Sequence, residues 1–138
     1  MMIANAVVGR PVASGGKIAS LDPGRLDGKG KQAVELVLNG VRKTRNSLEV
    51  RVVLSSDSVK PFEAGRLYTY GEGSGDDQDH TGRFTPMKLS LDITQAARRL
   101  AGASRVDVRI HLLDKGQEAD EPLFVENIEL HRRDHDEP

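Results

Sequence analysis

The chain has 138 residues, of which 37% are hydrophobic, 30% are charged and only 4% are aromatic. This length predicts one domain with a single core, and the composition predicts that the core is built of aliphatic side chains. The absence of cysteine excludes disulfides, a thiol nucleophile and cysteine-based zinc or iron–sulfur sites. The formal net charge is −1, and no run of Lys and Arg is interleaved with aromatic residues, so the sequence argues against a nucleic-acid partner.

The charge is divided unevenly along the chain. Residues 1–60 hold 10 Lys and Arg against 5 Asp and Glu, a net +5, whereas residues 61–138 hold 10 against 16, a net −6. Such a division can orient a domain against a partner, but strands from the two halves that interleave would mix the charges, and we prefer this second interpretation. No segment approaches the ~20 apolar residues of a membrane span, and no basic segment precedes the short apolar run at the N-terminus. We therefore expect a soluble, cytoplasmic protein without a membrane partner.

Three regions are expected along the chain. Residues 1–30 are rich in glycine and are interpreted as an irregular N-terminal extension or an edge strand, with Met1 to Val8 as the candidate strand. Residues 31–133 are expected to form a β-sandwich domain, and residues 134–138 a frayed tail.

From residue 32 onward, apolar and polar residues alternate. The segments 32–41, 47–57, 87–94, 105–114 and 123–133 each carry this period of two, which is typical of strands with one buried face. The phase is less regular around Glu126-Asn127, which predicts a bulge there. The fold class is therefore all-β, an antiparallel, jelly-roll-like β-sandwich.

One segment departs from the alternation. Residues 94–102 are predicted to form a short helical crossover between two strands. Thr94 is the expected N-cap and Gly102 the expected end. The apolar stripe of this helix is predicted to consist of Ala97, Leu100 and Ala101.

The order of these segments resembles a known family. The dipeptide Ala64-Gly65 precedes an aromatic strand, a pattern L-x-I-T-x-A runs from Leu91 to Ala96, and a closing strand V-x-N-I-E-L runs from Val125 to Leu130. Over about residues 32–133, this series resembles the C-terminal β-sandwich domain that follows the catalytic domain in plant polyphenol oxidases and many bacterial tyrosinase-like proteins.

The resemblance implies a function by binding. In that family the C-terminal domain packs over the type-3 dicopper site and shields it from substrate until the domain is displaced or cleaved. The copper is held by six histidines of the catalytic domain, whereas this chain has 4 histidines in all. The resemblance thus implies a non-enzymatic accessory domain with no cofactor of its own, a tyrosinase-like catalytic domain or protein as its partner, and copper in that partner or parent chain. Phe62, Phe84 and Tyr70 are candidates for the side chain that plugs the copper site.

Two other functions remain open at this point. The first is a copper carrier or chaperone for such an oxidase, for which His80, His111 and His131 are the weak metal-ligand candidates. The second is a generic ligand-binding β-sandwich module for carbohydrate or lipid, although the shortage of aromatic residues argues against stacking on sugars.

Residues 65–84 contain the aromatic strand and, after it, an acidic segment. Its carboxylates and single histidine have the chemistry of metal ligands, but their spacing fits no calcium loop, and their glycine-rich surroundings favour a mobile loop. We expect a partner-facing surface here, not a metal site. The candidate residues are Tyr70, Glu72, Asp76, Asp77, Asp79, His80 and Phe84. Tyr68 and Tyr70, which are spaced as Tyr-x-Tyr, are interpreted as packing residues of the strand.

Overall fold

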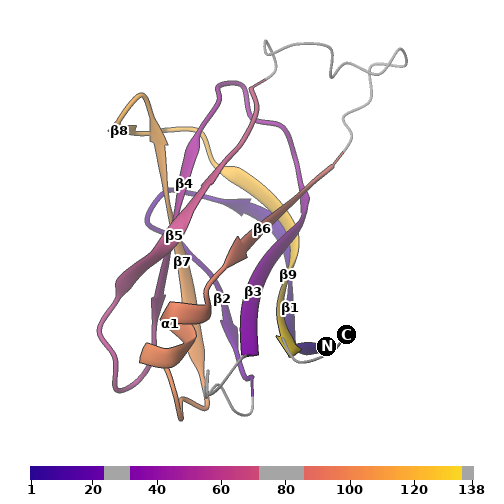
Figure 1. The fold of residues 1–138 in the computed structure, drawn as a ribbon. Helices are drawn as coiled ribbons and strands as arrows, with labels where there is room; N and C mark the ends of the chain where they lie inside the picture. Colours follow the sequence, from indigo (N-terminus) through magenta and orange to yellow (C-terminus); the bar gives the residue numbers. More distant parts are fainter. Residues whose placement is uncertain (24–31, 72–85, 135–138) are drawn as a thin grey trace.

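The computed structural model describes residues 1–23, 32–71 and 86–134 of the chain. The described residues form two β-sheets packed face to face, with one short helix at one end of the sandwich (Figure 1). The predicted all-β sandwich is confirmed.

The elements follow the chain in this order. The strands are β1 (Met2–Val12), β2 (Lys17–Leu21), β3 (Gln32–Val41), β4 (Glu49–Ser55), β5 (Phe62–Tyr68), β6 (Met87–Asp92), β7 (Val106–Asp114), β8 (Gln117–Glu118) and β9 (Leu123–Asp134), and the helix α1 (Thr94–Arg99) lies between β6 and β7.

The strand order is that of a jelly roll. Sheet A has the order β1-β9-β3-β6, and sheet B has the order β2-β7-β4-β5, with β8 beside β7. Every pair of strands within these sheets is antiparallel. Among the described strands, the chain crosses between the sheets at almost every connection, and only β4–β5 and β7–β8 are hairpins within one sheet. Apart from β8, this gives two four-stranded sheets in the double Greek-key arrangement of jelly rolls.

The core lies between the central strands of the two sheets. In β4 and β7 the alternation is complete: Val50, Val52 and Leu54 are buried from one strand, and Ile110 and Leu112 from the other. Each fully buried aliphatic side chain contributes about 1.5–3 kcal/mol relative to an exposed one. Because the other face of sheet B carries mainly polar side chains, with Val53 and Leu113 among them, the outer surfaces of β4, β5 and β7 are available for a functional site.

The N-terminal residues form edge strands. β1 is at one edge of sheet A and β2 at one edge of sheet B, so the candidate strand Met1 to Val8 lies within a longer edge strand, Met2–Val12. In the β1–β9 ladder, Val8 and Gly9 together face Glu126, and Gly9 has a φ of 57°. The irregularity predicted at Glu126-Asn127 is thus found at that place, with the extra residue on β1.

The helix differs in detail from the prediction. α1 begins at Thr94, and its N-cap is Ile93 without a side-chain cap, so the predicted cap at Thr94 is wrong. The Thr94 hydroxyl is used differently: it donates to Asp92 at 2.6 Å and accepts from the Val34 N–H at 3.0 Å, which ties the start of the helix to β3.

The end of the helix also differs from the prediction. α1 ends at Arg99, before Gly102, whose φ of 83° suits the end of a helical segment. Ala96, Ala97 and Leu100 are buried, whereas Ala101 is exposed. In the described part of the chain no helix is long and apolar enough to cross a membrane.

The edge strand β2 is linked to β7 through Asp107. The Ser20 hydroxyl donates to Asp107, and the Lys17 ammonium lies 3.2 Å from the same carboxylate. The hydrogen bond from Ser20, aided by Lys17, lowers the pKa of Asp107 below its ordinary value of 3.8. A carboxyl whose pKa is lower in the folded state contributes stability above its unfolded pKa and loses it as the pH falls through the folded pKa.

Ser20→Ala is therefore expected to flatten the pH dependence of the unfolding free energy below about pH 4. Urea unfolding at a series of pH values from neutral to acidic measures it. Ser90→Ala, on an exposed position of β6, is the matched control and should leave the pH profile unchanged. An identical profile for Ser20→Ala and the wild-type chain would contradict the assignment.

Candidate functional site

Three connections meet at one end of the sandwich, the upper end in Figure 1. We call residues 42–48, 69–71 and 115–122 the loop end. Thr44 and Gly71 form an isolated bridge, the Gly71 N–H donates to the Ser47 hydroxyl at 2.9 Å, and the backbone N–H groups of Arg45 and Asn46 donate to the carboxylate of Glu121. These hydrogen bonds hold the three connections against one another.

Two buried threonines fix the loop end from inside. Thr44 and Thr69 are each 2% exposed, and their hydroxyl oxygens lie 3.0 Å apart. The Thr44 hydroxyl donates to the carbonyl of Asn46, and the Thr69 hydroxyl accepts from the Leu48 N–H. Since each hydroxyl has one hydrogen, Thr69 must donate to Thr44. The result is one directed chain of hydrogen bonds, from the Leu48 N–H through both hydroxyls to the Asn46 carbonyl.

The two tyrosines point away from the core. Leu67 and Thr69 are buried, so the alternation places Tyr68 and Tyr70 on the outer surface, where they are 61% and 60% exposed. The interpretation of this Tyr-x-Tyr pair as packing residues is therefore wrong. The physical reason is the phase of the strand, which gives the inward positions to Leu67 and Thr69.

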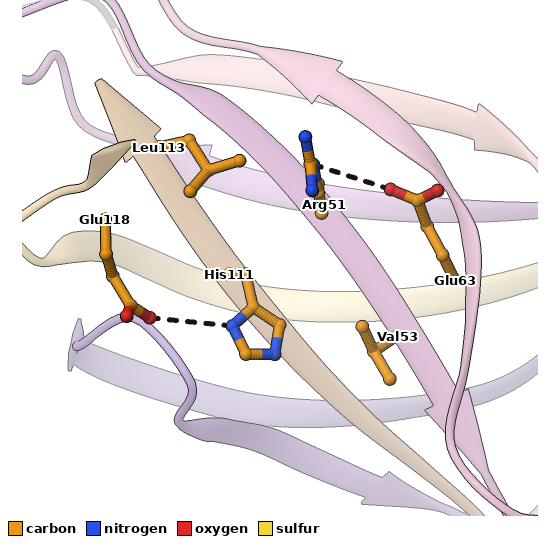
Figure 2. Close-up of a pocket in the computed structure, with 6 residues that line it drawn as sticks. All are labelled: Arg51, Val53, Glu63, His111, Leu113 and Glu118. Carbon is orange, nitrogen blue, oxygen red and sulfur yellow. Dashed lines mark ion pairs between the residues drawn. The ribbon is translucent and has the colours of Figure 1, made fainter. Parts of the chain in front are cut away.

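A groove runs beside these tyrosines on the outer face of sheet B. It has a volume of about 560 Å³, and its lining residues are Ser47, Leu48, Glu49, Arg51, Tyr68, Thr69, Tyr70, Leu113, Lys115 and Gly116. A second hollow of about 420 Å³ is lined by Arg51, Val53, Glu63, His111, Leu113 and Glu118 (Figure 2). Both share Arg51 and Leu113, so we treat them as one feature, the sheet-B groove.

Four charged residues form a closed network at this groove. The Arg51 Nε lies 3.1 Å from Glu49 Oε2 and 3.6 Å from Glu63 Oε1. Arg66 lies 3.4 Å from Glu49 Oε1 and 3.0 Å from Glu63 Oε1. The hydrogen bond to Glu63 raises the pKa of Arg66 above its ordinary value. Exposed ion pairs of this kind stabilise a fold only weakly, but their cross-linking restrains the side chains that line the groove.

His111 lies on the other side of the same hollow. Its Nδ1 is 3.6 Å from Glu118 Oε1, and that carboxylate oxygen accepts a hydrogen bond from the Ser14 hydroxyl at 2.8 Å. The Ser14 hydroxyl also accepts from the Leu112 N–H at 2.8 Å. Ser14 is thus paired with a carboxylate and a backbone group, and the described contacts join it to no histidine that would serve as its base.

The metal-ligand candidates are on different sheets. His111 is on the outer face of sheet B, whereas His131 is on β9 of sheet A, where its Nε2 is 3.0 Å from Glu129 Oε1. Hydrogen bonds from His131 and Asn39 lower the pKa of Glu129. Within the described residues, no three His, Asp or Glu side chains gather as a metal site would require.

The acidic segment itself is outside the described residues. This applies to Glu72, Asp76, Asp77, Asp79, His80 and Phe84. Of the predicted partner-facing set, Tyr70 is described, and it lies on the surface at the loop end.

A further acidic hollow marks the loop end. It has a volume of about 280 Å³, and its lining residues are Arg45, Asn46, Leu48, Asp114, Gln117, Glu118, Ala119, Asp120 and Glu121. Four acidic residues and one arginine therefore line this hollow. This surface favours a positively charged neighbour.

Phe62, another candidate plug, lies at the opposite end of β5. Its half-buried ring stacks under Arg99 of α1, with the guanidinium carbon 3.9 Å from the ring centroid.

Comparison of the chain with protein-family models, with curated proteins and with solved structures finds no match.

Proposed function

We propose that this chain is a non-catalytic binding domain that packs over and shields the type-3 dicopper site of a tyrosinase-like oxidase, in a partner protein or in a parent chain. Two kinds of support are independent of each other. The order of its sequence segments resembles the shielding domain of that family, and its loop end presents an exposed aromatic side chain. The exposure of Tyr70 is the observation on which the proposal depends most.

Tyr70 is better suited to plug a substrate channel than Phe62. Its ring is 60% exposed, and the residues on both sides of it are fixed, since Thr69 is buried and the Gly71 N–H is bonded to Ser47. An aromatic anchor held in this way loses little conformational entropy on docking. Phe62, by contrast, is engaged with Arg99 at the other end of the sandwich.

We expect the acidic hollow at the loop end to face a basic rim around the copper site. Asp114, Glu118, Asp120 and Glu121 surround the acidic hollow. Exposed charges of this kind accelerate and orient association and are screened by salt. The proposed inhibition should therefore weaken as the ionic strength rises.

The test is to add the purified chain to the copper-loaded catalytic domain of a tyrosinase-like oxidase and to measure catechol oxidation. A saturable decrease in rate is expected, and Tyr70→Ser should raise the inhibition constant at least about tenfold, as for an aromatic hot spot. Val7→Ser is the matched control, because Val7 is 86% exposed on β1 of the other sheet.

Three further outcomes decide the parts of the proposal. An unchanged oxidation rate at saturating concentrations of the chain would exclude shielding. An inhibition constant that is independent of salt would exclude the electrostatic part. Copper-dependent catechol oxidation by the chain alone would exclude a purely non-catalytic role.

A further inference from the structure

The outer face of sheet B has an open groove that extends from the loop end along the sheet. The groove crosses the strands β5, β4 and β7, from the tyrosines at one end to Val53 and His111 at the other. Arg51 and Leu113 belong to both halves. We propose that this groove binds a neutral oligosaccharide chain.

The first argument is the order of aromatic, charged and apolar side chains along the groove. In the register of the sheet, Tyr68 faces Glu49, and Glu49 faces Leu113. Aromatic rings combine a broad apolar surface with a polar hydroxyl, and Tyr70 adds a second ring two positions further along the chain. Val53 and Leu113 extend the apolar floor beyond the rings, and Figure 2 shows them beside the two ion pairs. Sugar rings likewise combine apolar C–H faces with polar edges.

The second argument is the balance of donors and acceptors. Hydroxyl groups both donate and accept hydrogen bonds, and the groove offers both partners. Glu49, Glu63 and Glu118 provide carboxylate oxygens. Arg51 provides N–H donors, and its two described ion pairs both involve Nε, so Nη1 and Nη2 lie outside those contacts.

The third argument is the net charge of this surface, which favours neither acidic nor basic ligands. The residues that line the groove contribute −3 from Glu49, Glu63 and Glu118 and +2 from Arg51 and Lys115. Arg66, which pairs with Glu49 beside the groove, brings the sum to zero with His111 counted as neutral. Neither an acidic nor a basic polymer is attracted to a surface of this kind, whereas a neutral polyhydroxylated chain pairs with it locally.

The position of the groove also distinguishes a sugar from an extended peptide. A peptide that adds to a sheet pairs with the backbone of an edge strand. This groove lies on the face of the sheet. It reaches the edge strand β5 at Tyr68, but its middle lies over β4 and β7, whose backbone groups are already paired with neighbouring strands. Recognition must therefore come from side chains, and the ion-pair network holds several of them in place before a ligand arrives.

The test is calorimetric titration of the full chain with linear hexasaccharides of glucose and of N-acetylglucosamine, with a galacturonic acid hexamer as the acidic probe. Saturable binding of at least one neutral hexasaccharide is expected, with less than about a twofold change in affinity as the salt concentration rises. Tyr68→Ala should weaken binding about tenfold, corresponding to about 1.4 kcal/mol, and Tyr68→Phe should retain it. Arg51→Lys keeps the charge but loses the planar donor fork, so weaker binding is expected.

Val7→Ala, on the other sheet, is the control and should bind as the wild-type chain does. Since Tyr68 is 61% exposed, its variants should keep the thermal unfolding midpoint of the parent chain. No binding of either neutral probe, equal affinity of Tyr68→Ala and the wild-type chain, or tighter binding of the acidic probe would each overturn the proposal. The readout is direct binding, so it is independent of the oxidase experiment.

Discussion

Gly40→Ala is expected to lower the free energy of unfolding by about 2–5 kcal/mol, from backbone strain and overpacking together. Gly40 has a φ of 62°, in the left-handed region that side chains with a Cβ adopt at a cost. A Cβ at this position would also lie 2.4 Å from the Cβ of Glu126. That atom cannot rotate away, because a Cβ moves only with its backbone, and β9 is paired with β3 on one side and β1 on the other.

Gly102→Ala separates strain from the clash. Gly102 has a φ of 83°, but nothing lies within 4 Å of the Cβ that alanine would add. Its cost should be that of strain alone, about 1–2 kcal/mol. Chemical denaturation of both variants and the parent chain measures the difference. Equal losses of unfolding free energy would show that the approach of Glu126 to Gly40 carries no cost.

The strands with complete alternation could be predicted from the sequence because one face of each strand is buried in the core and the other faces solvent. In β4 and β7 every second residue is buried against the other sheet, so the hydrophobic pattern records the fold directly. β1 is an edge strand whose residues are mostly exposed or half-buried and which contains the bulge at Gly9, so its pattern carries little information. β2 is only 5 residues long, so its alternating pattern is also too short to stand out in the sequence.

The candidate site was harder to predict because it depends on which strands are neighbours. The orientation of Tyr68 could have been found from the sequence, since Leu67 fixes the phase of the strand. Arg51 pairs with Glu63 within the β4–β5 hairpin, and His111 with Glu118 within the β7–β8 hairpin, but the pairing of β4 with β7, which brings both pairs into one groove, follows from the strand order of sheet B. No local pattern gives that order. The same applies to His131, which the fold places on the other sheet from His111.

Thr69 shows the limit of pattern-based analysis. A threonine between two tyrosines suits an exposed strand position, yet it is 2% exposed. The phase of the strand turns it inward, and Thr44, 25 residues away in the sequence, provides the partner that its buried hydroxyl needs. Buried polar groups require such partners, and a partner from another connection becomes visible only in the folded chain.

Thr69→Val is expected to lower the free energy of unfolding by about 2–4 kcal/mol. Valine has nearly the shape of threonine, so packing is retained and the hydroxyl is lost. The Leu48 N–H then has no acceptor from this side chain in a buried environment, and Thr44 loses the donor inferred for it. A buried donor that loses its partner costs about 1–3 kcal/mol, and the lost bond between the hydroxyls adds about 1 kcal/mol.

Thr69→Ser is the matched control, because it keeps the hydroxyl and removes one methyl group, at a cost of about 1 kcal/mol. Urea unfolding of the two variants gives the comparison, and hydrogen exchange at the Leu48 amide reports the lost hydrogen bond directly. Faster exchange is expected in the valine variant alone. If valine were tolerated better than serine, packing and not the hydroxyl chain would stabilise the loop end, and the fixed position of Tyr70 would need another cause.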